Sequence, residues 1–299
     1  MRVHVLGSAA GGGFPQWNCN CPNCRGLRAG TLRAKARTQC SIAITGNGSE
    51  WILLNASPDL PAQIASFPEL HPPNSARGSS IASVMLTDGE LDHITGLLSL
   101  RENEPIELRC TPRVYEWVFE ANPIFAGLVQ PTRFRWVPVE NRQPTPCRGD
   151  LSIEAVYVPG KRPTYVRTSV ESIDGSTLAY IIRHGRAKSS ILYVPAIKEI
   201  SEELVAAASE CECILFDGSF WSDDDMARRG VGTRTASAMG HVPIDGPGGS
   251  LARLSHLRAR KVYTHVNNTN PILDEASPER RAIEEAGWEV AEDGMDFAL

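Results

Sequence analysis

Asp92 and His93 are adjacent residues with metal-binding side chains, in the segment LTDGELDHITGLL that covers residues 86–98. They follow an apolar run, so we expect them just past the carboxyl end of a strand. His265 ends a similar run, KVYTHV, at residues 261–266. A single histidine in such a place is more often structural, but two imidazoles and a carboxylate on one face of an octahedral ion suit ferrous iron. We therefore predict an Fe(II) site at Asp92, His93 and His265, with about three coordination positions left open.

Two further polar residues are candidates for catalytic roles near this site. His241, in AMGHVPI, precedes an apolar pair and could act as a general acid–base or an additional ligand, the alternative being a structural role. Asp217 ends the apolar run CILFDG at residues 213–218. A carboxylate in that place more often closes a loop by accepting hydrogen bonds, and the alternative is that it faces the site.

A cysteine cluster predicts a second metal site. Cys19, Cys21 and Cys24 lie within six positions in CNCPNC, and three thiolates at this spacing can bind one tetrahedral ion with a fourth ligand from elsewhere. A closed sulfur-rich shell leaves no open position, so we predict a structural Zn(II). The alternative is that the three thiols simply share a loop. The remaining cysteines are scattered and are expected to be small buried apolar residues: Cys40, Cys110, Cys147, Cys211 and Cys213.

The composition is that of a globular protein with a sizeable core. The chain has 299 residues, of which 42% are hydrophobic and 22% charged, and a formal net charge of -5. No run of five Lys or Arg residues could collect phosphates, and no apolar run of membrane-spanning length or signal peptide is seen. We expect a cytoplasmic protein that binds neither nucleic acid nor membrane. No composition shift marks a boundary, so residues 1–299 are predicted to form one domain.

Short apolar runs bounded by Gly, Pro, Asn or Asp predict about ten strands, and about five helices lie among them. EISEELVAAASE (199–210) has helical spacing, and SPERRAIEEAG (277–287) has Ser277 as N-cap and Pro278 at the first helical position. The order of elements predicts two mixed sheets with helices outside, and residues 68–80 and 137–150 as loops. The predicted strands cover residues 2–7, 41–45, 51–55, 81–88, 151–158, 178–183, 190–195, 213–218 and 261–266.

Several of these motifs together resemble a known family. The segments LGSAAGGGFPQWNCNCPNC, LTDGELDHITGLLSLRE, FDGSFW, GVGTRTASAMGH and HVNNTNPIL are similar to those of the pyrroloquinoline quinone (PQQ) biosynthesis protein B, or PqqB, family. The resemblance implies an α/β metallo-β-lactamase fold, a four-layer αββα sandwich of two mixed sheets with its site at one edge. It extends from near the amino terminus to residue 273.

The resemblance also implies that a second ion has lost its ligands. Related binuclear hydrolases carry Thr-His-x-His-x-Asp-His where this chain has TDGELDH, so Asp88 and Glu90 replace two histidines. Their bridging aspartate corresponds to Pro195 or Ala196 here. In a related phosphodiesterase, a histidine completes the three-cysteine zinc site. The equivalent position is Asn268, so the candidates for the fourth zinc ligand are Asn268, a water molecule or another group of the protein.

The function that the resemblance implies is oxidative. An iron-dependent hydroxylase would use O2 to hydroxylate the tyrosine of a Glu-Tyr unit cut from a precursor peptide, in a pathway shared with other PQQ-biosynthesis proteins. One alternative is a carrier that helps PQQ or its precursor to reach the periplasm. The other is a metal-dependent hydrolase, which would require Asp88, Glu90 and His241 to hold another ion.

Overall fold

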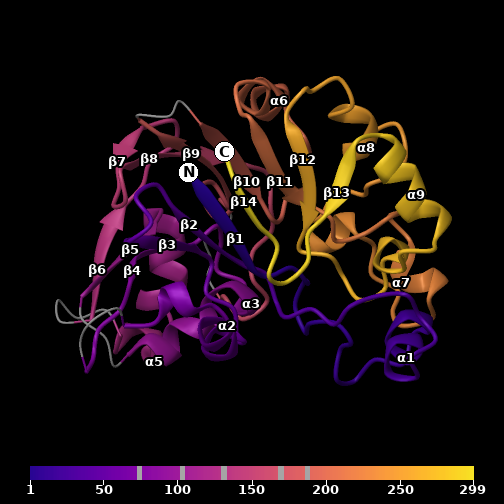
Figure 1. The fold of residues 1–299 in the computed structure, drawn as a ribbon, viewed down its shortest axis with the longest axis horizontal. Coiled ribbons are helices and arrows are strands. Elements are labelled where there is room, and N and C mark those ends of the chain that lie inside the picture. The colour runs from indigo at the N-terminus through magenta and orange to yellow at the C-terminus, as the bar shows by residue number, and fades with distance from the viewer. Residues whose placement is uncertain (73–75, 102–104, 129–132, 168–171, 186–188) are drawn as a thin grey trace.

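Two seven-stranded mixed sheets form the centre of the computed structural model, which describes residues 1–72, 76–101, 105–128, 133–167, 172–185 and 189–299 (Figure 1). The first sheet has the order β14 (Asp296–Ala298), β1 (Arg2–Gly7), β2 (Ser41–Thr45), β3 (Trp51–Leu54), β4 (Ile81–Met85), β5 (Ile106–Cys110) and β6 (Phe134–Pro138). The second has the order β13 (Trp288–Val290), β12 (Arg260–Thr264), β11 (Cys213–Asp217), β10 (Ser190–Val194), β9 (Leu178–His184), β8 (Leu151–Tyr157) and β7 (Thr145–Pro146). The predicted pair of mixed sheets is confirmed.

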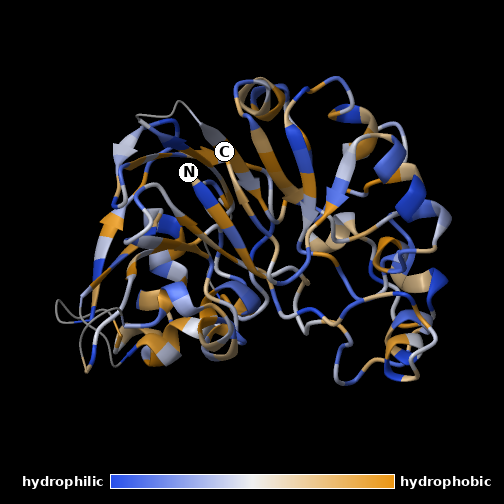
Figure 2. Ribbon diagram, viewed as in Figure 1, coloured by the Kyte–Doolittle hydropathy of each residue, from blue (hydrophilic) through white to orange (hydrophobic). Residues whose placement is uncertain are grey.

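Alternating side chains of the strands build the core on both faces of each sheet. In β10, Ile191 and Tyr193 join the apolar cluster between the two sheets, whereas Leu192 and Val194 join the cluster under the outer helices. All four are fully buried, which is why this strand reads as a continuous apolar run rather than an alternating one. In Figure 2 the helices change between hydrophilic and hydrophobic colours along their length, as expected for elements with one buried face.

The helices cover the outer faces of the two sheets and so complete the αββα sandwich (Figure 1). The α-helices are α1 (Pro22–Arg28), α2 (Leu60–Ser66), α3 (Leu91–Ile94), α4 (Pro112–Tyr115), α5 (Pro123–Ala126), α6 (Glu202–Ser209), α7 (Asp225–Arg228), α8 (Ser250–Arg253) and α9 (Pro278–Glu285). Shorter turns are the 3-10 helices η1 (Pro68–Leu70), η2 (Thr95–Leu100), η4 (Ser237–Met239) and η5 (Pro271–Leu273), and the π-helical η3 (Glu116–Glu120).

Helix α9 forms as its sequence signals predict. The hydroxyl of Ser277 accepts a hydrogen bond from the backbone N–H of Arg280 at 3.0 Å, and Pro278 takes the first helical position. Gly287 follows the helix with φ of 77°, a left-handed conformation that favours glycine. The predicted helix at residues 199–210 is likewise confirmed as α6, which begins after the N-cap Ser201.

The described residues contain more strands than the apolar runs predict. Strand β5 carries Glu107 and Arg109, which interrupt its apolar pattern, yet both are buried because they pair with each other at 2.7 Å. Strands β6, β13 and β14 were also not expected, and β7 lies in a segment predicted as loop. The other predicted loop, 68–80, contains η1, and its residues 73–75 lie outside the described residues.

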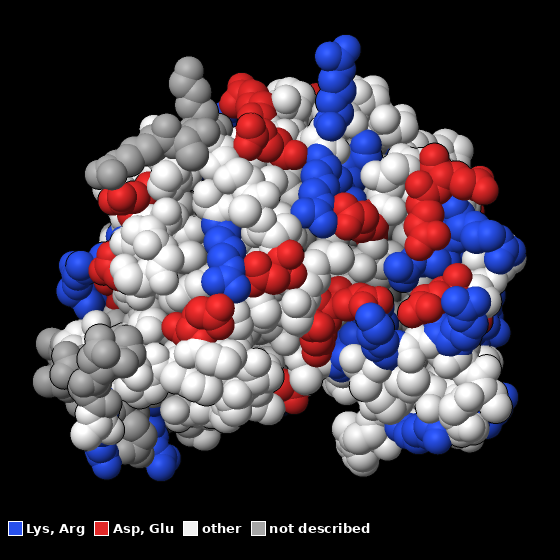
Figure 3. Space-filling model, in the orientation of Figure 1, with Lys and Arg blue, Asp and Glu red and all other residues white. Residues whose placement is uncertain are grey.

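The two chain ends lie side by side because β14 pairs antiparallel with β1 (Figure 1). Among the described residues, no helix has both the length and the apolar character needed to cross a bilayer. On the face drawn in Figure 3, acidic and basic side chains are interspersed. Strands β10, β11 and β12 are mutually parallel, so their carboxyl ends meet at one edge of the second sheet. That edge carries Asp217 and His265, whereas Asp92 and His93 follow β4 of the first sheet.

Candidate metal centres

Asp92, His93 and His265 converge in the structure although they come from opposite halves of the chain. Asp92 and His93 lie in α3, and His265 directly follows β12. Nε2 of His265 is 3.2 Å from Oδ2 of Asp92, and Nε2 of His93 is 3.9 Å from the same oxygen. One potential ligand atom of each residue lies within 4.8 Å of the others. The structure thus brings the three predicted ligands within reach of one cation.

The ring of His93 is oriented by Asp88. Nδ1 of His93 lies 2.8 Å from both carboxylate oxygens of Asp88, and both side chains are buried. Nε2 of His93 is also buried, and within the described part of the chain it has no hydrogen-bond partner. Leaving a buried polar atom unpaired costs about 1–3 kcal/mol, and a metal ion would satisfy it. A carboxylate behind the histidine is the usual support of a metal ligand. These residues therefore fit a metal ion, with Asp88 in the supporting layer.

The carboxylates around His93 favour its charged form. Burial lowers the pKa of His93, but Asp88 and Asp92 outweigh burial and raise the pKa to about 9. Burial raises the pKa of Asp92, but the His93 and His265 rings outweigh it and hold that pKa well below its usual range. A cation bound here would therefore replace a proton of His93 and meet an ionised Asp92.

His265 has an unusual backbone conformation. Its φ is 54°, in the left-handed region, which costs a residue other than glycine about 1–3 kcal/mol. Hydrogen bonds hold the turn, because the N–H of Val266 donates to the carbonyl of Ser8 at 2.9 Å and the hydroxyl of Ser219 lies 3.0 Å from the carbonyl of His265. Such conformations concentrate at functional sites, so this one supports a functional role for His265.

A hydrogen-bonded group orients His241 and His265 together. Asp217, at the end of β11, accepts hydrogen bonds from Nδ1 of His241 at 2.8 Å and from the hydroxyl of Ser219 at 2.6 Å. The oxygen of Ser219 lies 2.9 Å from Nδ1 of His265 and accepts its N–H. This assignment gives each of these donors an acceptor, and in the neutral ring that a metal ligand requires it leaves Nε2 without a proton. Nε2 of His265 then points its lone pair toward the shared cation site.

His241 and Asp217 differ in their access to the cavity. His241 lines the cavity at the triad, whereas Asp217 is fully buried and also accepts from the N–H of Ile197 at 3.2 Å. Of the two alternatives for Asp217, the geometry favours the buried hydrogen-bond acceptor, which positions His241. Sequence reasoning missed Ser219, because a single serine in FDGS carries no signal of metal chemistry. Only the structure shows that its side chain lies between His241 and His265.

A cavity of about 200 Å³ opens beside the triad and has both polar and apolar walls. Phe220, Met239 and Ala10 supply apolar surface. Gly11 lies against the triad, because a Cβ at this position would be 3.2 Å from Oδ2 of Asp92. The glycine run that follows β1 therefore allows the backbone to approach the candidate ligand closely. An apolar wall beside a metal site suits a substrate with an aromatic ring.

The residues that replace second-ion ligands are engaged elsewhere. The carboxylate of Glu90 forms an ion pair with the ammonium of Lys161. Asp88 is bonded to His93 and also accepts the N–H of Glu90 at 2.8 Å. Ala196, one of the two residues that the family resemblance places at the bridging aspartate, lines the cavity. Both carboxylates therefore have a protein side chain as partner in this structure.

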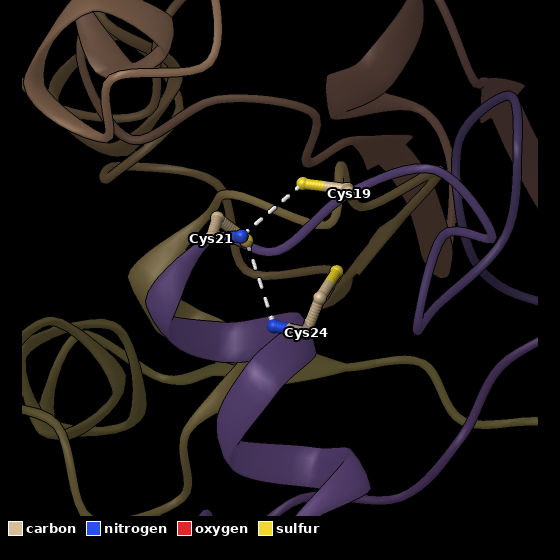
Figure 4. A group of neighbouring side chains, drawn as sticks. All are labelled: Cys19, Cys21 and Cys24. Atoms are coloured by element: carbon tan, nitrogen blue, oxygen red, sulfur yellow. Dashed lines mark hydrogen bonds between the residues drawn. The ribbon is translucent and has the colours of Figure 1, made fainter.

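The three predicted zinc ligands also lie together. Figure 4 shows the side chains of Cys19, Cys21 and Cys24 around the start of α1, with backbone N–H groups donating to two of the sulfurs at 3.5 Å. The side-chain nitrogen of Asn268 lies 3.1, 3.6 and 3.3 Å from the three sulfurs. Asn268 therefore has the position of a fourth ligand, and its amide would have to turn over to present oxygen to an ion.

The thiol cluster is tied to the loop that carries His265. The side chain of Asn23 donates to the carbonyl of Asn268 at 3.1 Å and to that of Asn270 at 2.9 Å. Asn270 in turn donates to the carbonyl of Gly218, beside the Asp217 group, at 2.8 Å. An ion held by the thiols would stiffen this loop and, through it, the position of His265.

Replacing Cys21 with serine is expected to release zinc and to lower the melting temperature by several degrees, because one thiolate of a closed shell is lost. Metal analysis and calorimetry of the purified protein measure both effects. Cys147→Ser is the matched control, since this half-buried thiol lies outside the cluster and its loss should leave the zinc in place. A Cys21→Ser protein that retained its zinc and its melting temperature would show that the thiols do not form a structural site.

The comparisons with known proteins identify the family. Residues 50–266 match a family model described as a beta-lactamase superfamily domain. Coenzyme PQQ synthesis protein B of Klebsiella pneumoniae (strain 342) is 44% identical over 309 residues, which cover 100% of this chain and 98% of the relative. The protein of the same description from Azoarcus sp. (strain BH72) is 43% identical over 304 residues, with both chains fully covered. The chain belongs to the coenzyme PQQ synthesis protein B family.

One solved structure agrees with membership of the PqqB family, and a second shares the fold. The 1.98-Å crystal structure of Zn²⁺-bound PqqB from Methylobacterium extorquens superposes with a TM-score of 0.94 and 39% identity, covering 100% of both chains. A diphosphatase of the PhnP family, at 17% identity, covers 100% of this chain and 97% of its own with a TM-score of 0.68, a likeness of fold alone. The family and the metallo-β-lactamase fold expected from the sequence motifs are confirmed.

Proposed function

We propose that this protein acts in PQQ biosynthesis as a mononuclear iron enzyme that uses O2 to hydroxylate the tyrosine ring of a Glu-Tyr unit derived from a precursor peptide. The observation that carries the proposal is the convergence of Asp92, His93 and His265, while Asp88 and Glu90 are bonded to protein side chains. A two-ion hydrolase needs both metals to activate water and to stabilise the leaving oxygen. One facially bound ion suits redox chemistry better.

Asp92, His93 and His265 would hold the iron through one carboxylate oxygen and two Nε2 atoms. Ferrous iron in a two-histidine, one-carboxylate set keeps positions open and supplies O2 activation. The Zn²⁺ in the M. extorquens PqqB structure supports a metal-binding role for the family. The buried, unpaired Nε2 of His93 supports the same role in this chain.

The remaining residues of the site position the substrate and its protons. His241 lines the cavity, and the carboxylate of Asp217 holds its Nδ1, so its Nε2 can take a proton from the substrate phenol and later return it. Phe220 and Met239 offer the apolar wall that a tyrosine ring requires. Each hydroxylation places one oxygen atom on the ring and releases the other as water, with two electrons from an external reductant and two protons.

The proposal is tested by an oxygen-dependent mass gain. Protein purified without oxygen and loaded with Fe(II) is mixed with Glu-Tyr and a reductant, and is then exposed to isotopically labelled O2. We expect product that carries one or two labelled oxygen atoms, and no such product from the zinc-loaded protein. If iron-loaded protein leaves both Glu-Tyr and longer tyrosine peptides unlabelled, the hydroxylase function is wrong. Tight binding of PQQ independent of iron would instead favour the carrier function.

A further inference from the structure

Two cationic side chains stand on the wall of the cavity at the triad, Lys161 and Arg234. Arg234 belongs to the turn that leads to Gly240, and Lys161 packs against the same turn. The stem of Lys161 packs under Gly240, where a Cβ would come within 3.0 Å of its Cγ, and the guanidinium of Arg234 donates to the carbonyl of Ala238 at 3.4 Å. Gly240 has φ of 85° and leads directly into His241. Both cations are therefore close to the candidate proton-transfer residue.

The turn that carries Arg234 is held by specific contacts. Asp223 accepts hydrogen bonds from the backbone N–H of Ser237 at 2.8 Å and from its hydroxyl at 2.7 Å. The N–H of Ala236 donates to the carbonyl of Asp223 at 2.9 Å. These bonds fix the backbone at the base of the turn, and they therefore restrict the position of the Arg234 side chain at the cavity.

Each acidic side chain on the cavity wall has a protein partner, whereas Arg234 has no acidic one among the described residues. Of the three acids, Asp88 pairs with His93, Asp92 with His265, and Glu90 with Lys161. Arg234 is exposed, and within the described part of the chain its guanidinium forms a hydrogen bond to the carbonyl of Ala238 and no ion pair. An exposed arginine is usually no more than a solvated charge. Here it stands on the wall of a cavity that also has an apolar wall, which is the combination that binds an aromatic acid.

We infer that Arg234, with the ammonium of Lys161 beside it, forms an anion subsite that binds a carboxylate of the substrate and holds the aromatic ring toward Asp92, His93 and His265. Lys161 is kept in place by Glu90, and its remaining N–H groups are donors on the same cavity wall as the planar guanidinium of Arg234. The identity of the substrate rests on the proposed function, but the chemistry of the subsite does not. It predicts selection for an aromatic compound with a free carboxylate over its neutral amide.

The test measures binding without O2, on zinc-loaded protein, so that no turnover is needed. The probes are Glu-Tyr and 4-hydroxyphenylacetate, each compared with its carboxamide by calorimetry. For the unaltered protein we expect each acid to bind more tightly than its amide. Arg234→Ala should weaken binding of the acids roughly tenfold to a hundredfold, the range for one lost charge-assisted hydrogen bond, and leave the amides unchanged. Arg234→Lys should recover part of the difference in affinity between acid and amide, because lysine restores the positive charge but not the paired N–H donors of the guanidinium.

Arg228→Ala is the matched control. Arg228 lies on the same segment but is exposed, pairs with Asp224 at 2.7 Å and is not on the cavity wall, so its loss should leave both probes unaffected. If Arg234→Ala binds acids and amides as the unaltered protein does, the subsite is wrong even where Glu-Tyr is hydroxylated. If 4-hydroxyphenylacetate binds in an Arg234-dependent way but Glu-Tyr is neither bound nor hydroxylated, the anion subsite is supported and the proposed substrate is wrong.

Discussion

Replacing His93 with alanine is expected to remove the iron from the protein and to abolish tyrosine hydroxylation. The change deletes one of three ligands, and loss of even a supporting residue weakens metal binding about 10–100-fold, so we expect a loss of at least about a hundredfold. Asp88 keeps hydrogen bonds from the N–H of Glu90 at 2.8 Å and the hydroxyl of Thr87 at 2.9 Å, so the fold should survive. Iron per chain after desalting, and labelled product from O2, are the measurements.

His256→Ala is the control for His93→Ala, because His256 is exposed and away from the cavity. It should retain full iron and full activity. Asp92→Asn tests a second ligand of the same site with little change in side-chain volume. It should also lose iron, because a neutral amide replaces an ionised carboxylate. Retention of iron and activity by either ligand variant would remove the basis for the assigned site.

Asp88→Ala separates a mononuclear site from a two-ion site. As the partner of Nδ1 of His93, Asp88 should affect how tightly one ion binds, and its loss should weaken that ion about 10–100-fold. If Asp88 were instead a ligand of a second ion, its loss would reduce the saturating number of active-site ions from two to one. Titration with Mn²⁺ against a competing chelator measures both affinity and stoichiometry. We expect one ion at saturation before and after the change.

Two further variants sharpen the Asp88 experiment. Asp88→Asn keeps a hydrogen-bond acceptor for the His93 ring and should retain part of the affinity that Asp88→Ala loses. Glu90→Gln removes a carboxylate that pairs with Lys161 and touches no candidate ligand, so it should leave affinity for the single ion within a few fold. A fall in stoichiometry with either Asp88 or Glu90 would favour the hydrolase alternative.

Much of the fold follows from local patterns, and the exceptions have physical reasons. Central strands such as β10 are apolar throughout, because both of their faces are covered. Strand β5 escaped detection since its buried Glu107 and Arg109 neutralise each other, a contact that no short window of sequence can anticipate. Strand β14 is only three residues long and depends on pairing with β1 at the other end of the chain.

Some residues of the candidate site can be predicted from the sequence and others cannot. Residues close in sequence, such as Asp92 with His93 and the cysteine cluster, are recognisable because their spacing itself indicates a metal. The supporting residues cannot be recognised in this way. Ser219 and Lys161 contact His265 and Glu90 only because folding brings together residues that are distant in the sequence. Asp88 shows the limit most clearly. The motif marks it as an altered ligand position, whereas the structure shows it turned toward the ring of His93.

Anomalous diffraction at the iron edge, from crystals of the protein loaded anaerobically with Fe(II), would test the account most directly. We predict a single iron peak in the cavity, within bonding distance of Asp92, His93 and His265, with Glu90 still paired to Lys161. Two iron peaks in the cavity, with Asp88 or Glu90 bound to one of them, would contradict the account, as would one peak out of reach of His265.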